Sequence, residues 1–367
     1  MRPEAKTGIL DIAPYVPGAS KAAGHAKPIK LSANENPLGC SEKARAAYLA
    51  SADELHLYPD ARTARLRAAI AAKYGLEPER LLFGAGSDEL FSIACMAYLG
   101  AGDNMVQPQY GFAAWAIAAH AAGGGVKSAP ERDYTVDVDA ILATVDRRTR
   151  IVFIANPANP TGTWLPFGEI ERLHAGLPGN VLLVLDGAYS ECAVGLRGYS
   201  AGLEWARDKE NVLVTRTFSK MYGLASLRIG WGYAPARVAE ALDRIRLPFS
   251  ISRGGEAAAV AAIEDEAFLQ RSVDMLTSGR TMLREGLAAL GARTLPSAAN
   301  FITANFDSTG LSAEQIAAEL AHGGILVRHL RNYGMPDWLR ISVGSEAELK
   351  ALLERLGLIV EAAKARV

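Results

Sequence analysis

The stretch that decides the fold is Thr215-Arg-Thr-Phe-Ser-Lys-Met-Tyr-Gly-Leu-Ala-Ser-Leu-Arg-Ile-Gly-Trp231, which directly follows a short apolar run. The apolar run predicts a buried strand. The hydroxyls of Thr217 and Ser219 and the guanidinium of Arg228 lie close to Lys220 in the sequence, and such groups suit a phosphate held beside a reactive amine. Apolar neighbours predict partial burial, which lowers the pKa of a lysine and favours its nucleophilic form. Because a lone loop lysine is more often a solvated charge, the rest of the chain must decide.

Composition narrows the class of protein. The chain has 367 residues, half of them hydrophobic, and a formal net charge of -1, which predicts an ordinary soluble protein of two domains that does not bind nucleic acid. The three cysteines form no CxxC pair and suit a reducing compartment. The histidines form no HExxH motif, so we expect no metal site. No apolar run approaches membrane-spanning length and no signal peptide is recognisable, so we expect a cytoplasmic protein without a membrane partner.

Predicted strands alternate with predicted helices from residue 80 onward. The strands are expected at residues 80–83, 104–107, 126–129, 150–155 and 181–185. This alternation predicts a mostly parallel sheet with helices on both faces. Beyond residue 290, strands at 301–304, 325–327 and 338–343 flank two helices and predict a smaller α/β domain. The expected division is a large cofactor-binding domain over residues 30–250 and a small domain built from residues 1–29 and 251–367.

Polar residues follow the carboxyl ends of these strands, where open α/β sheets bind their ligands. The turn Gly84-Ala-Gly-Ser-Asp88 leads from a strand into a helix, so free N–H groups are available to an anion. Helix capping explains Ser87 and Asp88 equally well. Asp186 ends the strongest strand, and Asn159 follows another. Each residue has an ordinary structural explanation when taken alone, but one site could collect them all.

Five segments, taken in order, resemble the motifs of class I/II aminotransferases, which are pyridoxal-phosphate enzymes of fold type I. They are residues 84–89, 156–162, 186–189, 217–220 with Arg228, and 339–344. Any one motif is weak, whereas five at family-like spacing along nearly the whole chain are specific. The resemblance implies a large domain with a mostly parallel sheet sandwiched by helices, a smaller α/β domain, and pyridoxal 5'-phosphate as cofactor. It also implies a homodimer with shared active sites.

The resemblance gives roles to individual residues. Lys220 would hold the cofactor's aldehyde as a Schiff base and then act as general base and acid. Asp186 would keep the pyridine nitrogen protonated, so that the ring can accept electrons. Tyr189 and Asn159 would donate to the phenolate oxygen, and Tyr110 would stack on the ring. The residues implied for the cofactor phosphate are Gly86, Ser87, Asp88, Ser219 and Arg228, with Thr217 as a weaker candidate and Tyr58 from the other subunit.

Within the family the chain is most similar to histidinol-phosphate aminotransferases. That likeness rests on residues 14–18, 32–37, 58–60 and 327–344. It implies that Tyr15 and Arg328 face the distal phosphate, that Arg340 binds a substrate carboxylate, and that Asn36 and Asn159 contact substrate. The expected reaction moves the amino group of L-histidinol phosphate to 2-oxoglutarate, in histidine biosynthesis.

Some positions and patterns leave alternatives open. Gly187 stands where the family often has glutamate, and Cys192 where it often has an aromatic residue, which leaves the substrate uncertain. An aromatic or broad-specificity aminotransferase and a threonine-phosphate-type decarboxylase share this fold. Gly198-Tyr-Ser-Ala-Gly202 matches the hydrolase motif GxSxG, but no buried strand precedes it. A non-catalytic regulatory module would be expected with a DNA-binding domain, and no such domain is recognisable.

Overall fold

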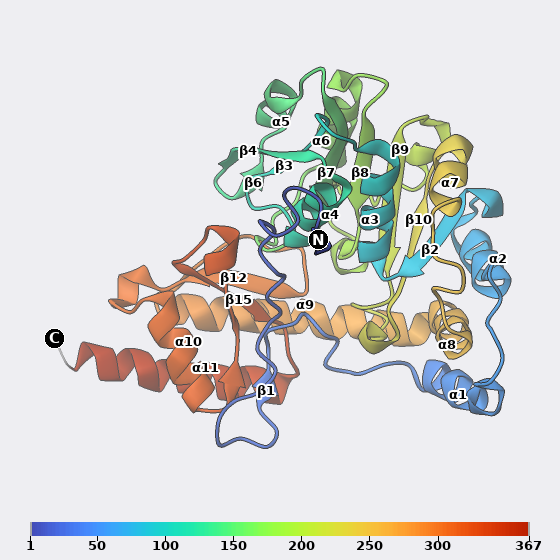
Figure 1. Cartoon of the computed structure of the whole chain (residues 1–367). Coiled ribbons are helices and arrows are strands. Elements are labelled where there is room, and N and C mark those ends of the chain that lie inside the picture. The colour runs from blue at the N-terminus through green and yellow to red at the C-terminus, as the bar shows by residue number, and fades with distance from the viewer. Residues whose placement is uncertain (1, 366–367) are drawn as a thin grey trace.

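The computed structural model describes residues 2–365, and a seven-stranded sheet organises the first two-thirds of them (Figure 1). The strands lie in the order β2 (Leu81–Ala85), β10 (Ile229–Tyr233), β9 (Val212–Thr217), β8 (Leu182–Asp186), β7 (Thr149–Ala155), β3 (Asn104–Pro108) and β4 (Gly125–Ala129). All run parallel except β10, which is antiparallel to both of its neighbours. The predicted, mostly parallel sheet is therefore confirmed.

Helices cover both faces of this sheet. One face packs against α3 (Ser87–Tyr98), α4 (Ala113–Ala122) and α7 (Ala236–Asp243), and the other against α2 (Ala64–Tyr74), α5 (Val138–Thr144), α6 (Phe167–Gly176) and α8 (Arg253–Glu264). Strand β8 shows why a continuous apolar run is needed: Leu182 and Val184 enter one core, while Leu183 and Leu185 enter the other. A strand buried on both faces therefore reads as a near-continuous apolar run.

A second sheet lies in the carboxyl-terminal part of the chain. Its strands are antiparallel, in the order β11 (Arg293–Thr294), β12 (Phe301–Asn305), β15 (Trp338–Ser342) and β14 (Arg328–His329). Helices α9 (Glu266–Ala289), α10 (Ala313–His322) and α11 (Glu346–Lys364) pack with it around a separate core. The amino-terminal strand β1 (Ile29–Lys30) joins this part by pairing with β13 (Ile325–Leu326). The smaller α/β domain predicted from the sequence is thus present.

The remaining segments connect the two sheets. Helix α1 (Glu42–Ala50), capped by Ser41, packs against α8, and a hairpin of β5 (Glu131–Arg132) and β6 (Thr135–Val136) extends beyond β4. The domain division at residues 250–251 stays a prediction, and the apolar side chains of α8 pack with the large sheet rather than the small one. Among residues 2–365, no helix is long and apolar enough to cross a membrane, and no group of three or more His, Cys, Asp or Glu side chains could hold a metal.

Candidate active site

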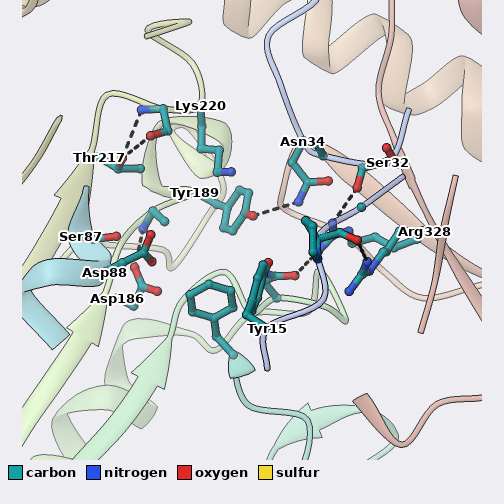
Figure 2. A pocket seen from close by; sticks show the side chains of 18 of the residues that line it. Tyr15, Ser32, Asn34, Ser87, Asp88, Asp186, Tyr189, Thr217, Lys220 and Arg328 are labelled. Atoms are coloured by element: carbon teal, nitrogen blue, oxygen red, sulfur yellow. Dashed lines mark hydrogen bonds between the residues drawn. The ribbon is translucent and has the colours of Figure 1, made fainter. Parts of the chain in front are cut away.

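A cavity of about 380 Å³ lies between the carboxyl edge of the large sheet and the small sheet (Figure 2). It collects residues from segments far apart in the sequence. The predicted residues that line it are Tyr15, Ser87, Asp88, Asn159, Asp186, Tyr189, Thr217, Ser219, Lys220, Arg228, Arg328 and Arg340. Strands β2, β7, β8 and β9 all end at this edge, which is why short polar segments after separate strands meet in one place.

One end of the cavity is built to bind an anion. Helix α3 begins at Ser87 and directs its free N–H groups toward this end. The Arg228 guanidinium lies against the same turn, where Nη1 donates to Ser219 Oγ at 3.1 Å and Nη2 donates to Asp88 Oδ2 at 3.0 Å. Glycine suits this position, because the φ of Gly86 is 78° and a Cβ would lie 2.2 Å from Arg228 Nη2 and displace the guanidinium. Backbone and arginine donors therefore converge on one spot.

The hydroxyls after strand β9 complete this end. Thr217 Oγ1 donates to Ser219 Oγ at 3.0 Å and accepts from the Ser219 N–H at 3.1 Å. These bonds fix the turn that leads into Lys220, and both hydroxyls line the cavity. Hydroxyl, amide and guanidinium donors together match the oxygens of a phosphate group.

Lys220 is held in the cavity as a reactive amine. Its Nζ lies 5.6 Å from the centre of the Tyr189 ring, and the two side chains face each other in Figure 2. Burial, reinforced by the positive charge of Arg340, lowers the pKa of the Lys220 ammonium. A lysine with a lowered pKa is neutral more often, and a neutral amine can attack a carbonyl carbon.

Asp186 is a buried carboxylate at the end of strand β8. Its Oδ1 accepts from the Ala188 N–H at 3.0 Å and from Thr215 Oγ1 at 3.4 Å, whereas Oδ2 has no hydrogen-bond partner among residues 2–365. Burial raises the pKa of Asp186 to about 7, although the bond from Ala188 opposes the shift. A cationic partner in the cavity would stabilise the carboxylate form.

Tyr189 belongs to a polar network that the sequence revealed only in part. Its hydroxyl accepts from Asn34 Nδ2 at 2.9 Å, and burial raises the pKa of Tyr189 to about 12. Asn34 in turn accepts from Ser342 Oγ at 2.9 Å, at the end of strand β15. The neutral phenol can therefore donate into the cavity while it remains fixed to the small sheet.

Two arginines lie side by side on the small sheet. Arg328 of β14 and Arg340 of β15 are direct cross-strand partners, and both line the cavity. Arg340 Nη1 donates to Asn159 Oδ1 at 2.6 Å, and Nη2 donates to the Ser32 carbonyl at 3.1 Å. Like charges in direct cross-strand positions repel each other, so this pair suits an anionic ligand.

The amino-terminal segment crosses the cavity next to these arginines. Arg328 donates to the backbone carbonyls of Val16 and Pro17, and the Tyr15 ring meets Phe112 edge-to-face with 6.3 Å between centroids. Tyr15 is half exposed and lines the mouth of the cavity, as Figure 2 shows. This segment and Phe112 therefore form an aromatic wall beside the arginines.

Four predicted site residues do not line the cavity. The Tyr110 ring stacks on Tyr134 with 5.4 Å between centroids, in the turn between the end of strand β3 at Pro108 and the start of helix α4 at Ala113. Phe112 lines the cavity instead. Asn36 turns away and donates to the Met221 carbonyl at 2.8 Å.

The other two positions that do not line it are Gly86 and Tyr58. Gly86 contributes only the absence of a side chain beside Arg228, and Tyr58 is 79% exposed on the surface. Asn34, Phe112 and Tyr333 line the cavity although none was predicted to. Asn34 has a left-handed backbone conformation, with φ of 57°. Asparagine tolerates this conformation better than most residues, so its residue type was the one signal in the sequence for an unusual turn here.

The alternative hydrolase motif lacks its required setting. Residues 194–200, which precede and include Ser200, are turns and irregular chain rather than a strand. Ser200 Oγ accepts from the Gly202 N–H at 3.1 Å, which is an ordinary turn contact. A nucleophile elbow requires a strand that leads directly into a sharp turn, so the GxSxG match carries no hydrolase site.

The residues present fit pyridoxal phosphate, the cofactor implied by the resemblance. The partner-free Oδ2 of Asp186 is an acceptor for a protonated ring nitrogen, and Lys220 offers the amine for an aldehyde. At the other end, the α3 N-terminus, Ser219 and Arg228 supply phosphate donors. Acceptor, amine and phosphate donors thus border one cavity, and each matches a different group of the cofactor.

Comparison with known proteins identifies the same chemistry. Residues 26–356 match the family model described as aminotransferase class I and II. The chain is 52% identical to histidinol-phosphate aminotransferase 1 of Caulobacter vibrioides, covering 96% of this chain and 98% of that protein. It is 50% identical to histidinol-phosphate aminotransferase of Sphingopyxis alaskensis, covering 95% of both. The crystal structure of histidinol-phosphate aminotransferase from Sinorhizobium meliloti with pyridoxal-5'-phosphate superposes with a TM-score of 0.88, at 30% identity and 97% coverage of both chains.

Proposed function

The chain belongs to the class I and II aminotransferases and is a pyridoxal-phosphate-dependent transaminase, and we propose that it transfers the amino group of L-histidinol phosphate to 2-oxoglutarate. The observation that carries this proposal is the cross-strand pair of Arg328 and Arg340 at the cavity. A phosphate ester or a dicarboxylate would each neutralise the pair. The relatives named for histidinol phosphate support the choice of amino donor. We also propose a role in histidine biosynthesis and a cytoplasmic location.

The geometry supports a distinct position for each part of the substrate. Histidinol phosphate has no α-carboxylate, because its phosphate is carried on the carbon next to the amine-bearing carbon. We therefore propose that Arg340 and Arg328 bind this phosphate in one half-reaction and the carboxylates of the keto acid in the other. Tyr15, Phe112 and Tyr333 border the same region and supply aromatic surface for the imidazole ring.

Lys220 is the residue we propose for proton transfer. Its lowered pKa leaves the released amine neutral, so that Nζ can take a proton from the α-carbon and return it as general acid. When bound, pyridoxal phosphate supplies an electron sink for the charge that develops at this carbon. Asp186 would hold the ring nitrogen protonated, and Tyr189 and Asn159 would donate to the phenolate oxygen. Arg340 orients the substrate through Nη groups that also contact Asn159.

We propose that the enzyme works as a homodimer. An exposed apolar surface is formed by Tyr48, Leu49, Leu55, Leu57, Tyr58, Leu247 and Phe249. Tyr58 stacks on Phe249 with 4.8 Å between centroids, so exposed apolar side chains from these two segments meet, and exposed apolar patches mark interaction sites. In such a dimer Tyr58 would reach the partner's cofactor phosphate. Mixing Lys220→Ala and Tyr58→Ala proteins should then restore activity through hybrid dimers, and no restoration would argue for unshared sites.

The amino donor can be tested with one pair of variants. Arg328→Ala should reduce kcat/KM for histidinol phosphate much more than for phenylalanine, because a phosphate dianion engages both arginines whereas a single carboxylate can be held by Arg340 alone. Arg331→Ala is the matched control, since that arginine is exposed and pairs with Glu314 at 2.7 Å outside the cavity. Equal losses with both donors would refute the phosphate role. Threonine phosphate as a third donor, with carbon dioxide release measured, distinguishes a decarboxylase.

A further inference from the structure

A buried ion pair joins strand β9 to the short helix η3 (Ser190–Ala193), close to the cavity but outside its lining. Arg216 Nη2 donates to Glu191 Oε1 at 2.7 Å, and the side chains are only 4% and 6% exposed. Replacing a buried pair with apolar side chains is often neutral or stabilising. The pair is therefore poorly explained by stability alone, and its position suggests another use.

The pair connects the two segments that carry the cofactor-facing groups. Glu191 follows Tyr189 closely, in the segment that begins at Asp186. Arg216 lies on β9 between Thr215, whose hydroxyl contacts the Asp186 carboxylate, and the turn that leads to Lys220. Any movement of Glu191 relative to Arg216 thus changes where the β8–η3 segment stands relative to the lysine.

Gly187 shows how tightly this segment packs on β9. Its N–H donates to the Thr215 carbonyl at 2.9 Å. A Cβ at residue 187 would lie 2.9 Å from Arg216 Cδ and 2.6 Å from Ser190 Oγ. A side chain at residue 187 would crowd Ser190, the Arg216 stem and the Thr215 carbonyl together, so the glycine and the ion pair belong to the same close contact between the two segments.

The two charges depend on each other. Glu191 Oε2 and Arg216 Nε are buried and have no hydrogen-bond partner in the described part of the chain. The guanidinium also lies 5.7 Å and 5.9 Å from the ring centres of Tyr74 and Trp231. Loss of either charge leaves the other buried without a counter-charge, which strongly destabilises the contact between the two segments.

We infer that Glu191 and Arg216 are positioning residues for the cofactor site. Their ion pair fixes the β8–η3 segment against β9 and so sets the distance from the carboxylate and phenol of that segment to the amine of Lys220. Neither side chain touches the cofactor cavity, so the pair acts through the residues it holds. The inference rests on the chain's use of pyridoxal phosphate but not on which amino donor it takes.

The test measures cofactor binding rather than turnover. Glu191→Gln keeps the shape of the side chain and removes its charge, and it should weaken pyridoxal-phosphate binding to the apoenzyme on the order of ten- to hundredfold, as loss of a supporting residue commonly does. The pH titration of the bound cofactor's absorbance should also shift. Glu191→Asp, which keeps the charge, should recover part of both effects.

Arg80→Met is the matched control. Arg80 is also a buried arginine, 13% exposed, with its guanidinium 4.4 Å from the Tyr233 ring, but it lies at the edge of the sheet opposite the cavity. It should lower Tm and leave the cofactor affinity and titration unchanged. If Glu191→Gln behaves in the same way, losing only Tm, the positioning role is refuted.

A double variant keeps the test decisive if a single charge change prevents folding. Glu191→Gln combined with Arg216→Met removes both charges and leaves none uncompensated. If this protein folds with wild-type cofactor affinity and titration, the pair is merely structural and the inference fails. Weakened affinity with a shifted titration, in a protein whose Tm has recovered, supports it.

Discussion

Replacing Asp186 with asparagine should change the stability of the cofactor-free protein in a pH-dependent way. Burial raises the pKa of Asp186 from 3.8 to about 7, and a shift of about three units corresponds to about 4 kcal/mol at roughly 1.36 kcal/mol per unit. The folded protein binds this proton more tightly than the unfolded chain does. The stabilisation from this group is therefore complete below about pH 4 and is lost as the pH rises through about 7.

The magnitude can be isolated by comparing two pH values. Between about pH 5 and about pH 8, the protonation equilibria of the two states change the free energy of unfolding by roughly 2.5 kcal/mol. Asp186→Asn has no titrating group at this position and keeps Oδ1 as the acceptor for the Ala188 N–H. Any effect of the amide that does not depend on pH cancels in the comparison.

Urea unfolding of the cofactor-free proteins at both pH values, at one protein concentration, measures this difference. On going from the lower to the higher pH, the variant should gain roughly 2.5 kcal/mol relative to the wild type. A relative stability that stays constant would refute a raised pKa for Asp186. In the cofactor-bound enzyme the same substitution should instead weaken cofactor binding, because an amide cannot keep the ring nitrogen protonated.

Two further predictions concern the cofactor directly. Borohydride reduction should attach the cofactor to Lys220, and a peptide mass spectrum without that adduct would contradict the assignment. Gly86→Ala should weaken pyridoxal-phosphate binding, because its Cβ would displace the Arg228 guanidinium, whereas Gly102→Ala has a similar positive φ in open space and should leave binding unchanged. Equal affinities in the two alanine variants would mean that the space at residue 86 is not needed.

The main strands of the large sheet were predictable because each is an apolar run buried on both faces. Strand β10 was not, since glycines at positions 230 and 232 interrupt its apolar pattern. The structure explains one of them: a Cβ at Gly230 would lie 2.2 Å from the backbone of Gly86 and Ser87. That requirement comes from a segment far away in the sequence, so no local pattern could reveal it.

The site was predictable where a residue directly follows a strand and less so elsewhere. Asp186 and the segment leading to Lys220 are placed by strands that end at one edge. Asn34 and Asn36 are the same residue type in the same predicted turn, yet only Asn34 lines the cavity. Likewise, Phe112 lines the cavity and Tyr110 does not, although both lie in the short turn before helix α4. These outcomes depend on the path of the backbone within irregular segments, which no local sequence pattern predicts.

The proposed substrate site depends on a strand register that no local sequence pattern reveals. Arg328 and Arg340 become neighbours only because β14 pairs antiparallel with β15 in one register. A shift of one residue would turn Arg340 to the opposite face of the sheet and would break its contact with Asn159 from the large domain. That contact crosses from one sheet to the other, so a substrate held by Arg340 is placed relative to the cofactor residues. The pairing of two short strands thus links the proposed substrate-binding arginines to the proposed cofactor site.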